Sequence, residues 1–182
     1  MLAITDEPPS TRAWASGAVG ERGLAEALGQ VKGLQVLHDR SVPGTRGNID
    51  HIIVSAAGIF VVDAKHYHGL IRIRDRGGLF KTDNRLYVGS HDCSELADNM
   101  GWQVAAVQTA ISVAGIDPSP PVTPVLCFVD GEWPLFGGPD SYKGVRLEGK
   151  RSIKKLVSAT GHLDPGDVDR VARVLATGLP AK

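Results

Sequence analysis

The sequence predicts an α/β domain in which a mixed β-sheet is flanked by helices. Residues 49–55 and 59–64 are rich in β-branched and aromatic residues and are joined by a short turn that ends in glycine, which is typical of a β-hairpin. Residues 94–114 repeat apolar side chains at helical spacing. Residues 122–129 are almost continuously apolar, as in a strand that is covered on both faces. Helices and strands in this order give the α/β class.

The other segments follow the same local signals. Glycine and proline divide the chain into short periodic stretches, which set the expected boundaries. In chain order we expect a helix (16–32), a strand (34–39), a loop (41–47), the hairpin, a strand (70–74), a short strand pair (79–82 and 85–88), the long helix with Ser94 as N-cap, the apolar strand, a brief strand (144–147) and two helices (152–158 and 166–177).

Length and composition indicate one packed domain. The chain has 182 residues, of which 42% are hydrophobic and 22% charged, which is ordinary for a globular protein. We expect a flexible arm over residues 1–14, where Pro8-Pro9 breaks any periodicity, and a single domain over residues 15–182 that includes the C-terminal helices. No apolar run reaches the roughly 18 residues of a membrane span, and the first residues lack a signal-peptide pattern. We therefore expect a cytoplasmic protein without a membrane partner.

Charge and cysteine content limit the binding chemistry. The formal net charge is zero. Proteins that act on duplex nucleic acid usually carry a basic excess, so any affinity for nucleic acid must come from local patches. Cys93 and Cys127 lie far apart and outside any C-x-x-C spacing, so neither a zinc site nor a disulfide framework is indicated.

Three charged residues, Asp50, Asp63 and Lys65, interrupt the apolar hairpin. If residues 56–57 form a two-residue turn, Asp50 lies directly opposite Asp63. If residues 57–58 form it, Asp50 faces Lys65 instead, and Asp63 is its diagonal neighbour on the same face. Side chains alternate with period two, so either turn places all three on one face of the sheet, whereas a three-residue turn would separate them.

Two facing carboxylates repel each other and need a positive partner. Mg²⁺ or Mn²⁺ is the natural candidate, because these ions take carboxylate oxygens and waters and leave positions open for phosphate. Lys65 could then hold or activate the attacking water or stabilise charge on a phosphate. The alternative is an internal salt bridge between Lys65 and one aspartate, but this pairing leaves one carboxylate over in an apolar strand.

The spacing of Asp50 and Asp63-Ala64-Lys65 resembles the D…(D/E)-x-K signature of the PD-(D/E)XK nuclease superfamily. A closer resemblance, over roughly residues 17–130, is to the nuclease-related domain (NERD) family. It is carried by an ordered set of segments: Gly20-Glu21, VLHDRSVPG, NIDHIIV, GIFVVDAKHYHG and Trp102-Gln103. The resemblance implies a restriction-endonuclease-like fold and metal-dependent cleavage of phosphodiester bonds in nucleic acid.

Two further residues are candidates for the centre of this site. Glu21 falls on the apolar stripe of the first predicted helix, and the resemblance favours it as a third acidic contributor to the metal site; the alternative is a favourable contact with the N-terminal end of the helix dipole. Gln103 falls on the apolar stripe of the long helix. The resemblance suggests a supporting role, such as positioning Lys65 or water, and the alternative is a core-edge glutamine bonded to backbone.

Basic residues around the hairpin are candidates for substrate binding. Arg46 precedes the first strand of the hairpin, and His66 and His68 follow the second. Two histidines one residue apart could also suggest zinc, but the absence of cysteine partners and the carboxylate set argue against it. Arg72 and Arg74 alternate along the next strand, as in a phosphate-facing surface, although a solvated strand face would show the same pattern.

The sequence thus predicts a metal-dependent nuclease, with DNA the favoured substrate. Asp50, Asp63 and Glu21 would hold Mg²⁺ or Mn²⁺, Lys65 would orient or activate water, and Gln103 would assist. The alternative is a nucleic-acid-binding or protein-interaction module that retains the fold but catalyses little. A phosphodiesterase acting on small nucleotides is a third reading. The sequence leaves the oligomeric state open, a homodimer included.

Overall fold

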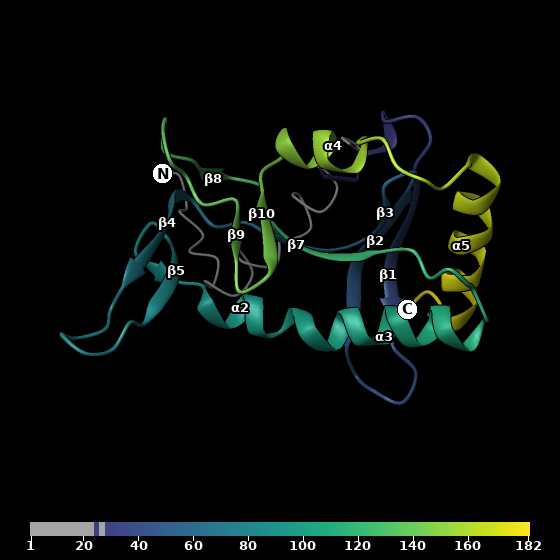
Figure 1. The fold of residues 1–182 in the computed structure, drawn as a ribbon, viewed down its shortest axis with the longest axis horizontal. Helices are drawn as coiled ribbons and strands as arrows, with labels where there is room; N and C mark the ends of the chain where they lie inside the picture. The colour runs from purple at the N-terminus through teal and green to yellow at the C-terminus, as the bar shows by residue number, and fades with distance from the viewer. Residues whose placement is uncertain (1–23, 26–27) are drawn as a thin grey trace, which may run out of the picture.

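The computed structural model describes residues 24–25 and 28–182 (Figure 1). Residues 24–25 and 28–29 are helical. The elements that follow are β1 (Gln35–Ser41), β2 (Asn48–Ser55), β3 (Gly58–Lys65), β4 (Gly69–Asp75), β5 (Asn84–Val88), β6 (His91–Asp92), α2 (Ser94–Asp98), α3 (Met100–Val113), β7 (Val122–Phe128), β8 (Gly131–Glu132), β9 (Ser141–Tyr142), β10 (Val145–Glu148), α4 (Ser152–Val157) and α5 (Pro165–Gly178).

The main sheet has six strands in the order β1-β2-β3-β7-β10-β9. β1, β2 and β3 are antiparallel neighbours, whereas β3, β7 and β10 run parallel to one another. A second sheet, in the order β6-β5-β4-β8, begins where β3 ends. The predicted mixed α/β class is confirmed, and the arrangement is consistent with a restriction-endonuclease-like fold.

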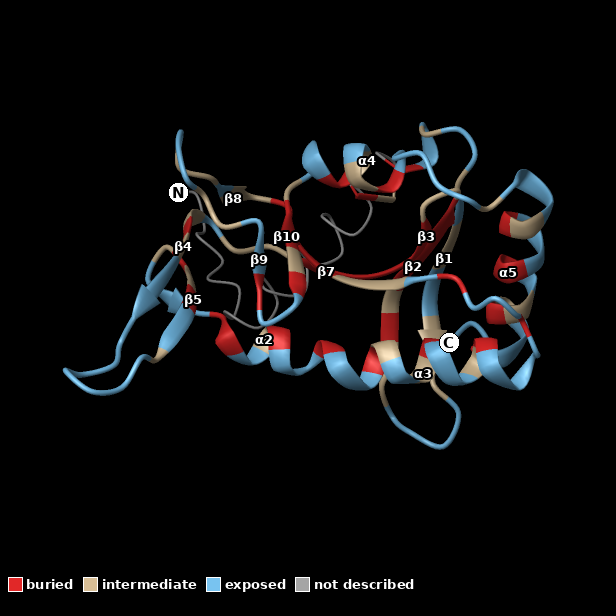
Figure 2. Cartoon of the chain, viewed as in Figure 1, coloured by how far each residue is buried: buried red, intermediate tan, exposed pale blue. Residues whose placement is uncertain are grey.

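Both faces of the main sheet are covered. Side chains on one face, such as Val61 and Leu126, pack with α3 and α5. Side chains on the opposite face, such as Val62 and Val125, pack with α4 and with Leu24 and Leu28. Figure 1 shows α3 and α4 on opposite sides of β7, and Figure 2 shows the buried residues of both helices turned towards the strands. The near-continuous apolar run of β7 is explained by this double burial.

Several predicted boundaries were wrong for local reasons. The long helix divides at Asn99 into α2 and α3. Ser94 is not its N-cap, because Cys93 occupies that position and the Ser94 hydroxyl instead accepts a hydrogen bond from the Leu86 backbone N–H. Residues 79–82 do not form a strand: Gly78 and Lys81 make a single bridge that closes a turn, and β5 pairs with β4.

None of the helices in the described residues is long and apolar enough to span a membrane.

Gly58 fixes the turn between β2 and β3. Its φ of 126° is strained for any residue with a Cβ. A Cβ built at this position would also lie 2.7 Å from the carbonyl oxygen of Pro121, which accepts a hydrogen bond from the Ile59 N–H at 2.9 Å. The start of β3 is therefore tied to the segment that leads into β7.

We predict that Gly58→Ala lowers the free energy of unfolding by about 2 kcal/mol or more, through backbone strain and the clash with Pro121. Gly101→Ala is the matched control, because a Cβ at this exposed position in α3 meets nothing within 4 Å. It should stabilise the protein by up to about 1 kcal/mol. Urea denaturation measures both variants, and equal effects would contradict this role of Gly58.

Candidate active site

The β2–β3 register brings the two predicted aspartates together. Ser55 pairs with Gly58, and the pairing continues to His51 opposite Val62, so the next step of the register places Asp50 opposite Asp63. Of the two registers that the sequence allowed, the structure adopts the one with a turn at residues 56–57. The Ser55 hydroxyl accepts a hydrogen bond of 3.2 Å from the Ala57 N–H, which helps to hold this turn.

The site lies on the sheet face that α3 covers. Ile59 and Val61 belong to the core on that face, and Asp63 and Lys65 continue the same alternating set along β3. The Asp63 side chain is 9% exposed and the Lys65 side chain 28% exposed, with Lys65 Nζ 2.6 Å from Asp63 Oδ1. Asp50 is half-buried. The Lys65–Asp63 ion pair, which the sequence offered as the alternative to a metal site, is thus present. Asp50 has no ion-pair partner of its own among the described residues.

Burial and neighbouring charge strongly perturb Asp63. Its pKa is raised to about 7: burial is the largest cause, the Lys65 ammonium opposes it, and repulsion and hydrogen bonding with the Asp50 carboxyl reinforce it. A hydrogen bond between two carboxyls requires that one of them hold a proton. At neutral pH the metal-free site therefore accepts a proton where a cation could bind.

Lys65 remains an ammonium ion. Burial lowers its pKa, but the ion pair with Asp63 and the field of Asp50 outweigh burial, so the net pKa is raised. A lysine with a raised pKa is a hydrogen-bond donor and a positive charge rather than a proton acceptor.

The donor set fits a hard divalent cation. Asp63 Oδ1 is buried and receives no well-directed hydrogen bond, even though Lys65 is close. Mg²⁺ is commonly held by one or two carboxylates, with waters and substrate phosphate completing its ligands. Among the described residues, no group of three or more His, Cys, Asp or Glu side chains is placed to hold a metal. Glu21, the predicted third acidic contributor, lies outside the described residues, as does the predicted arm.

Gln103 is buried in α3 and makes fewer hydrogen bonds than its side-chain amide could form. Its Nε2 makes only a weak 3.8 Å contact with Met100 Sδ, and its Oε1 has no partner. The alternative of a glutamine bonded to backbone is not what the structure has. No hydrogen bond joins Gln103 to Lys65, but α3 packs against the face that carries Asp63. An unpartnered buried amide oxygen is costly, so Gln103 has unused hydrogen-bonding capacity on the helix that packs against β3.

The sequence did not identify Asp130, which pairs with His66. Its Oδ2 lies 2.7 Å from His66 Nδ1, while His66 Nε2 is buried without a partner. His66 and Asp130 follow the ends of β3 and β7, which are parallel neighbours. The signal was available, because the carboxyl ends of adjacent parallel strands meet at one edge of the sheet. His68 is exposed.

The predicted basic residues are spread around the site rather than gathered in it. Arg46 is exposed in the loop after β1, which packs against α3 where Gly47 meets the Trp102 ring. Arg72 and Arg74 lie on β4 in the second sheet. The Arg74 guanidinium is 5.2 Å from the centre of the Tyr87 ring.

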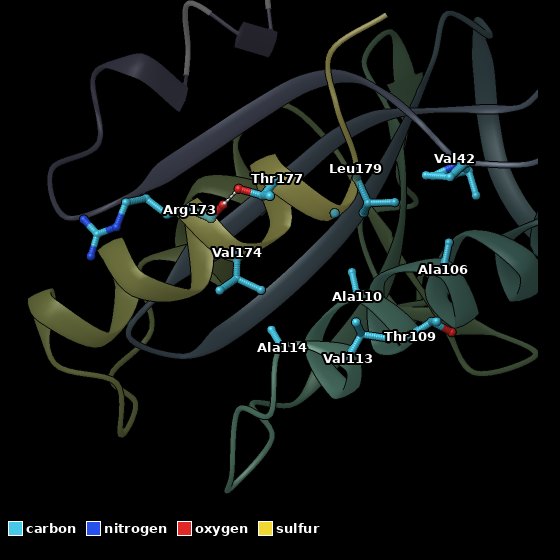
Figure 3. A pocket seen from close by; sticks show the side chains of 12 residues that line it. Val42, Ala106, Thr109, Ala110, Val113, Ala114, Arg173, Val174, Thr177 and Leu179 are labelled. Atoms are coloured by element: carbon cyan, nitrogen blue, oxygen red, sulfur yellow. Dashed lines mark hydrogen bonds between the residues drawn. The ribbon is translucent and has the colours of Figure 1, made fainter.

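An apolar pocket lies elsewhere. It has a volume of about 580 Å³ and is lined by α3, α5 and the loop after β1. Figure 3 shows small apolar side chains such as Ala110 and Val174 around it, with the Arg173 guanidinium pointing away from them. Asp50, Asp63, Lys65 and Gln103, the predicted catalytic residues that the structure describes, do not contribute to its lining.

A mixed sheet that carries facing aspartates and a lysine on one face is an arrangement of the restriction-endonuclease-like class. The chain belongs to the nuclease-related domain (NERD) family, because the model of that family matches residues 16–129. No curated protein and no solved structure was found to match the chain. Family membership supports a nuclease-related function and, in this family, the use of divalent metals.

We predict a specific pH dependence for Asp63→Asn in EDTA. The folded-state pKa of about 7 exceeds the ordinary value of 3.8, so the wild type loses stability as pH rises from about 4 to 7 while the variant does not. The stability difference in favour of the variant should grow over this window by up to about 1.4 kcal/mol per pH unit and level off above it.

Comparing the two proteins at each pH removes other titrations. Burial lowers the pKa of His51 to about 4, which gives the opposite trend: stability is lost as pH falls. The Asp63 carboxylate is only the smallest of the causes that act on the His51 pKa, so most of this contribution is common to both proteins and drops out of the difference. Urea denaturation between pH 5 and 8 measures the curve, and a difference that does not change with pH would contradict the raised pKa of Asp63.

Proposed function

We propose that this protein is a metal-dependent nuclease that hydrolyses phosphodiester bonds in nucleic acid, with DNA the favoured substrate. The observation that carries the proposal is the pair of facing carboxylates, Asp50 and Asp63, with the Lys65 ammonium beside them on one buried face. Membership of the nuclease-related domain family supports the reaction class. We further propose that residues 15–182 form one domain, since α5 packs against both α3 and β1.

Asp50 and Asp63 would hold Mg²⁺ or Mn²⁺, with Glu21 as a third contributor. When bound, the ion would supply a Lewis acid for the phosphate and lower the pKa of a water. Its charge would also replace Lys65 as the partner of Asp63. Metal binding would be the only role of the two aspartates, so the loss of either one should abolish turnover.

Lys65 would act as a donor rather than as a base. Its raised pKa keeps three N–H donors available. Once Asp63 is bound to a cation, these donors can orient the attacking water or stabilise negative charge that develops on the phosphate. Gln103, with its unpartnered Oε1, would help to position Lys65 or the water.

His66 would contact the substrate near the scissile bond. Asp130 holds His66 Nδ1, which leaves Nε2 to face another group. Arg46, His68, Arg72 and Arg74 would contribute phosphate contacts further away.

A binding module that retains the fold is the second candidate. It is favoured by the Lys65–Asp63 ion pair, which satisfies part of the site without a metal, and by the net charge of zero. In that case Lys65 would be a structural residue. Cleavage and metal binding distinguish the two candidates.

We predict that the wild type cleaves supercoiled plasmid or labelled single-stranded DNA with Mn²⁺ or Mg²⁺, and that EDTA abolishes cleavage. Lys65→Ala should reduce the rate by at least about 100-fold, because it removes a donor to developing charge. Lys32→Ala, at an exposed position before β1, is the matched control and should keep wild-type activity. Cleavage that survives Lys65→Ala would place the chemistry elsewhere, and no cleavage with either metal would favour the binding module.

We predict that millimolar Mn²⁺ raises the melting temperature of the wild type, because a ligand that binds only the folded state stabilises that state. The stabilisation is about 2.7 kcal/mol when the Mn²⁺ concentration is 100 times the Kd. Asp50→Asn should lose this shift. In EDTA at pH 8 the same variant should be as stable as the wild type or up to about 1 kcal/mol more stable, since it relieves carboxylate repulsion. An unfolded Asp50→Asn variant would instead support a structural salt bridge.

A further inference from the structure

The turn between β4 and β5 presents two apolar side chains to solvent. Leu79 is 97% exposed and Phe80 fully exposed. Figure 1 shows this hairpin projecting from one end of the molecule, and Figure 2 shows its outer part exposed. Transfer of a phenylalanine side chain from water to an apolar contact is favourable in proportion to the apolar area that it buries. The tip therefore has a contact surface with no occupant in the described part of the chain.

The tip is a defined turn. The Asp75 carboxylate oxygen Oδ1 accepts hydrogen bonds from the Gly77 N–H at 2.8 Å and from the Asp83 N–H at 2.9 Å. These two bonds hold the pKa of the Asp75 carboxyl below its usual value. Gly78 and Lys81 close the turn with a bridge. Leu79 and Phe80 are thus held at its outermost point.

The hairpin carries the positive charge that the chain as a whole lacks. Residues 69–88 contain five arginines and lysines and two aspartates, a formal net charge of +3, whereas the net charge of the chain is zero. The basic residues are Arg72, Arg74, Arg76, Lys81 and Arg85. Such a local excess is the electrostatic requirement for binding a polyanion.

The two faces of the hairpin differ. Ile71, Leu86 and Val88 point into the core. The other face carries Arg72 opposite Tyr87, and Arg74 opposite Arg85.

Like charges directly opposite each other are destabilising. Arg85 is neutralised by Asp83 at 2.9 Å and Asp92 at 3.2 Å. Arg74 makes no such ion pair with any described residue and lies over the Tyr87 ring. The outer face therefore carries a guanidinium, that of Arg74, with no anionic partner among the described residues.

The hairpin starts close to the proposed active site. β4 begins at Gly69, four residues after Lys65. Seven residues of extended strand reach about 20 Å. A polyanion whose scissile bond lies at Lys65 can thus extend along the hairpin towards its tip.

We propose that the β4–β5 hairpin is an arm that binds the unpaired part of a nucleic acid: its arginines contact phosphates, and Phe80 stacks on an unpaired base. The substrate class is nucleic acid with a single-stranded segment next to the cleaved bond. The inference rests on the proposed function. Base–aromatic stacking tolerates any base, so the arm gives a preference for unpaired structure rather than for sequence.

A membrane surface is the competing occupant. Basic residues beside an apolar tip also suit anionic lipid. An apolar tip of two residues is small for stable membrane attachment. Arginines arranged along a strand with an aromatic ring between them suit successive phosphates and bases better. Vesicle binding is therefore included in the test.

The test is fluorescence anisotropy of a labelled single-stranded DNA and of its duplex in EDTA, where cleavage does not interfere. Phe80→Ala should weaken single-strand binding by roughly 5- to 100-fold, and Phe80→Trp should retain it, because indole also stacks. Duplex affinity should change by less than about twofold. Since Phe80 is fully exposed, neither substitution should alter the melting temperature.

Phe136→Ala is the matched control. Phe136 is 91% exposed beside Leu135, but residues 130–140 contain no lysine or arginine. This variant should bind like the wild type. Arg74→Ala should weaken single-strand and duplex binding alike and reduce the salt dependence of binding by about one counterion.

Equal effects of Phe80→Ala and Phe136→Ala on single-strand binding would contradict the proposed role of the hairpin as a binding arm. Phe80-dependent binding to vesicles containing phosphatidylserine, without a change in DNA binding, would overturn it in favour of a membrane. If the wild type cleaves DNA but binding is independent of Phe80, the arm fails and the nuclease stands. If binding depends on Phe80 but no metal supports cleavage, the nuclease fails and the arm belongs to a binding module.

Discussion

The proximity of two carboxylates inside an apolar hairpin is the constraint on which the site depends. Asp50 and Asp63 face each other across β2 and β3, and one lysine pairs with only one of them. Two ionised carboxylates at this position destabilise the folded protein unless a further positive charge is bound. For this reason the pKa of Asp63 is raised, and the metal-free site tends to bind a proton. The fold maintains it because the surrounding strand residues are fully buried in two cores that α3, α5 and α4 complete.

The register that creates this proximity depends on backbone geometry some distance from the charges. A turn at residues 56–57 sets Ser55 opposite Gly58, and Gly58 approaches the Pro121 carbonyl too closely for a side chain. A three-residue turn would shift the pairing by one residue and separate Asp63 from Asp50 onto the other face of the sheet. The parallel pairing of β3 with β7 then brings His66 and Asp130 together at the carboxyl ends of the strands. The second sheet begins from the same edge, so the basic hairpin is connected to the site through only three residues.

The sequence could predict the hairpin, its charged face and the mixed α/β class, because turn chemistry and side-chain alternation are local signals. It left two registers open, since turns at residues 56–57 and at residues 57–58 both satisfy the local signals, and the structure has the first of them. Asp130 was missed because its partnership with His66 spans 64 residues and could be inferred only by assuming that the strands before them are parallel neighbours. The strand expected at residues 79–82 was wrong because the local sequence could not reveal a turn that is held by hydrogen bonds to the Asp75 carboxylate. The structure tests neither Glu21, which lies outside the described residues, nor the catalytic role of Gln103.

The proposed nuclease depends on Asp50 and Asp63 together binding a divalent cation. A crystal structure of the protein with Mn²⁺, with anomalous diffraction to locate the ion, tests it most directly. We expect a peak about 2.0–2.3 Å from a carboxylate oxygen of each aspartate, with Lys65 Nζ displaced from Asp63 Oδ1. An ordered site in which Lys65 still pairs with Asp63 and no peak lies between the aspartates would contradict it.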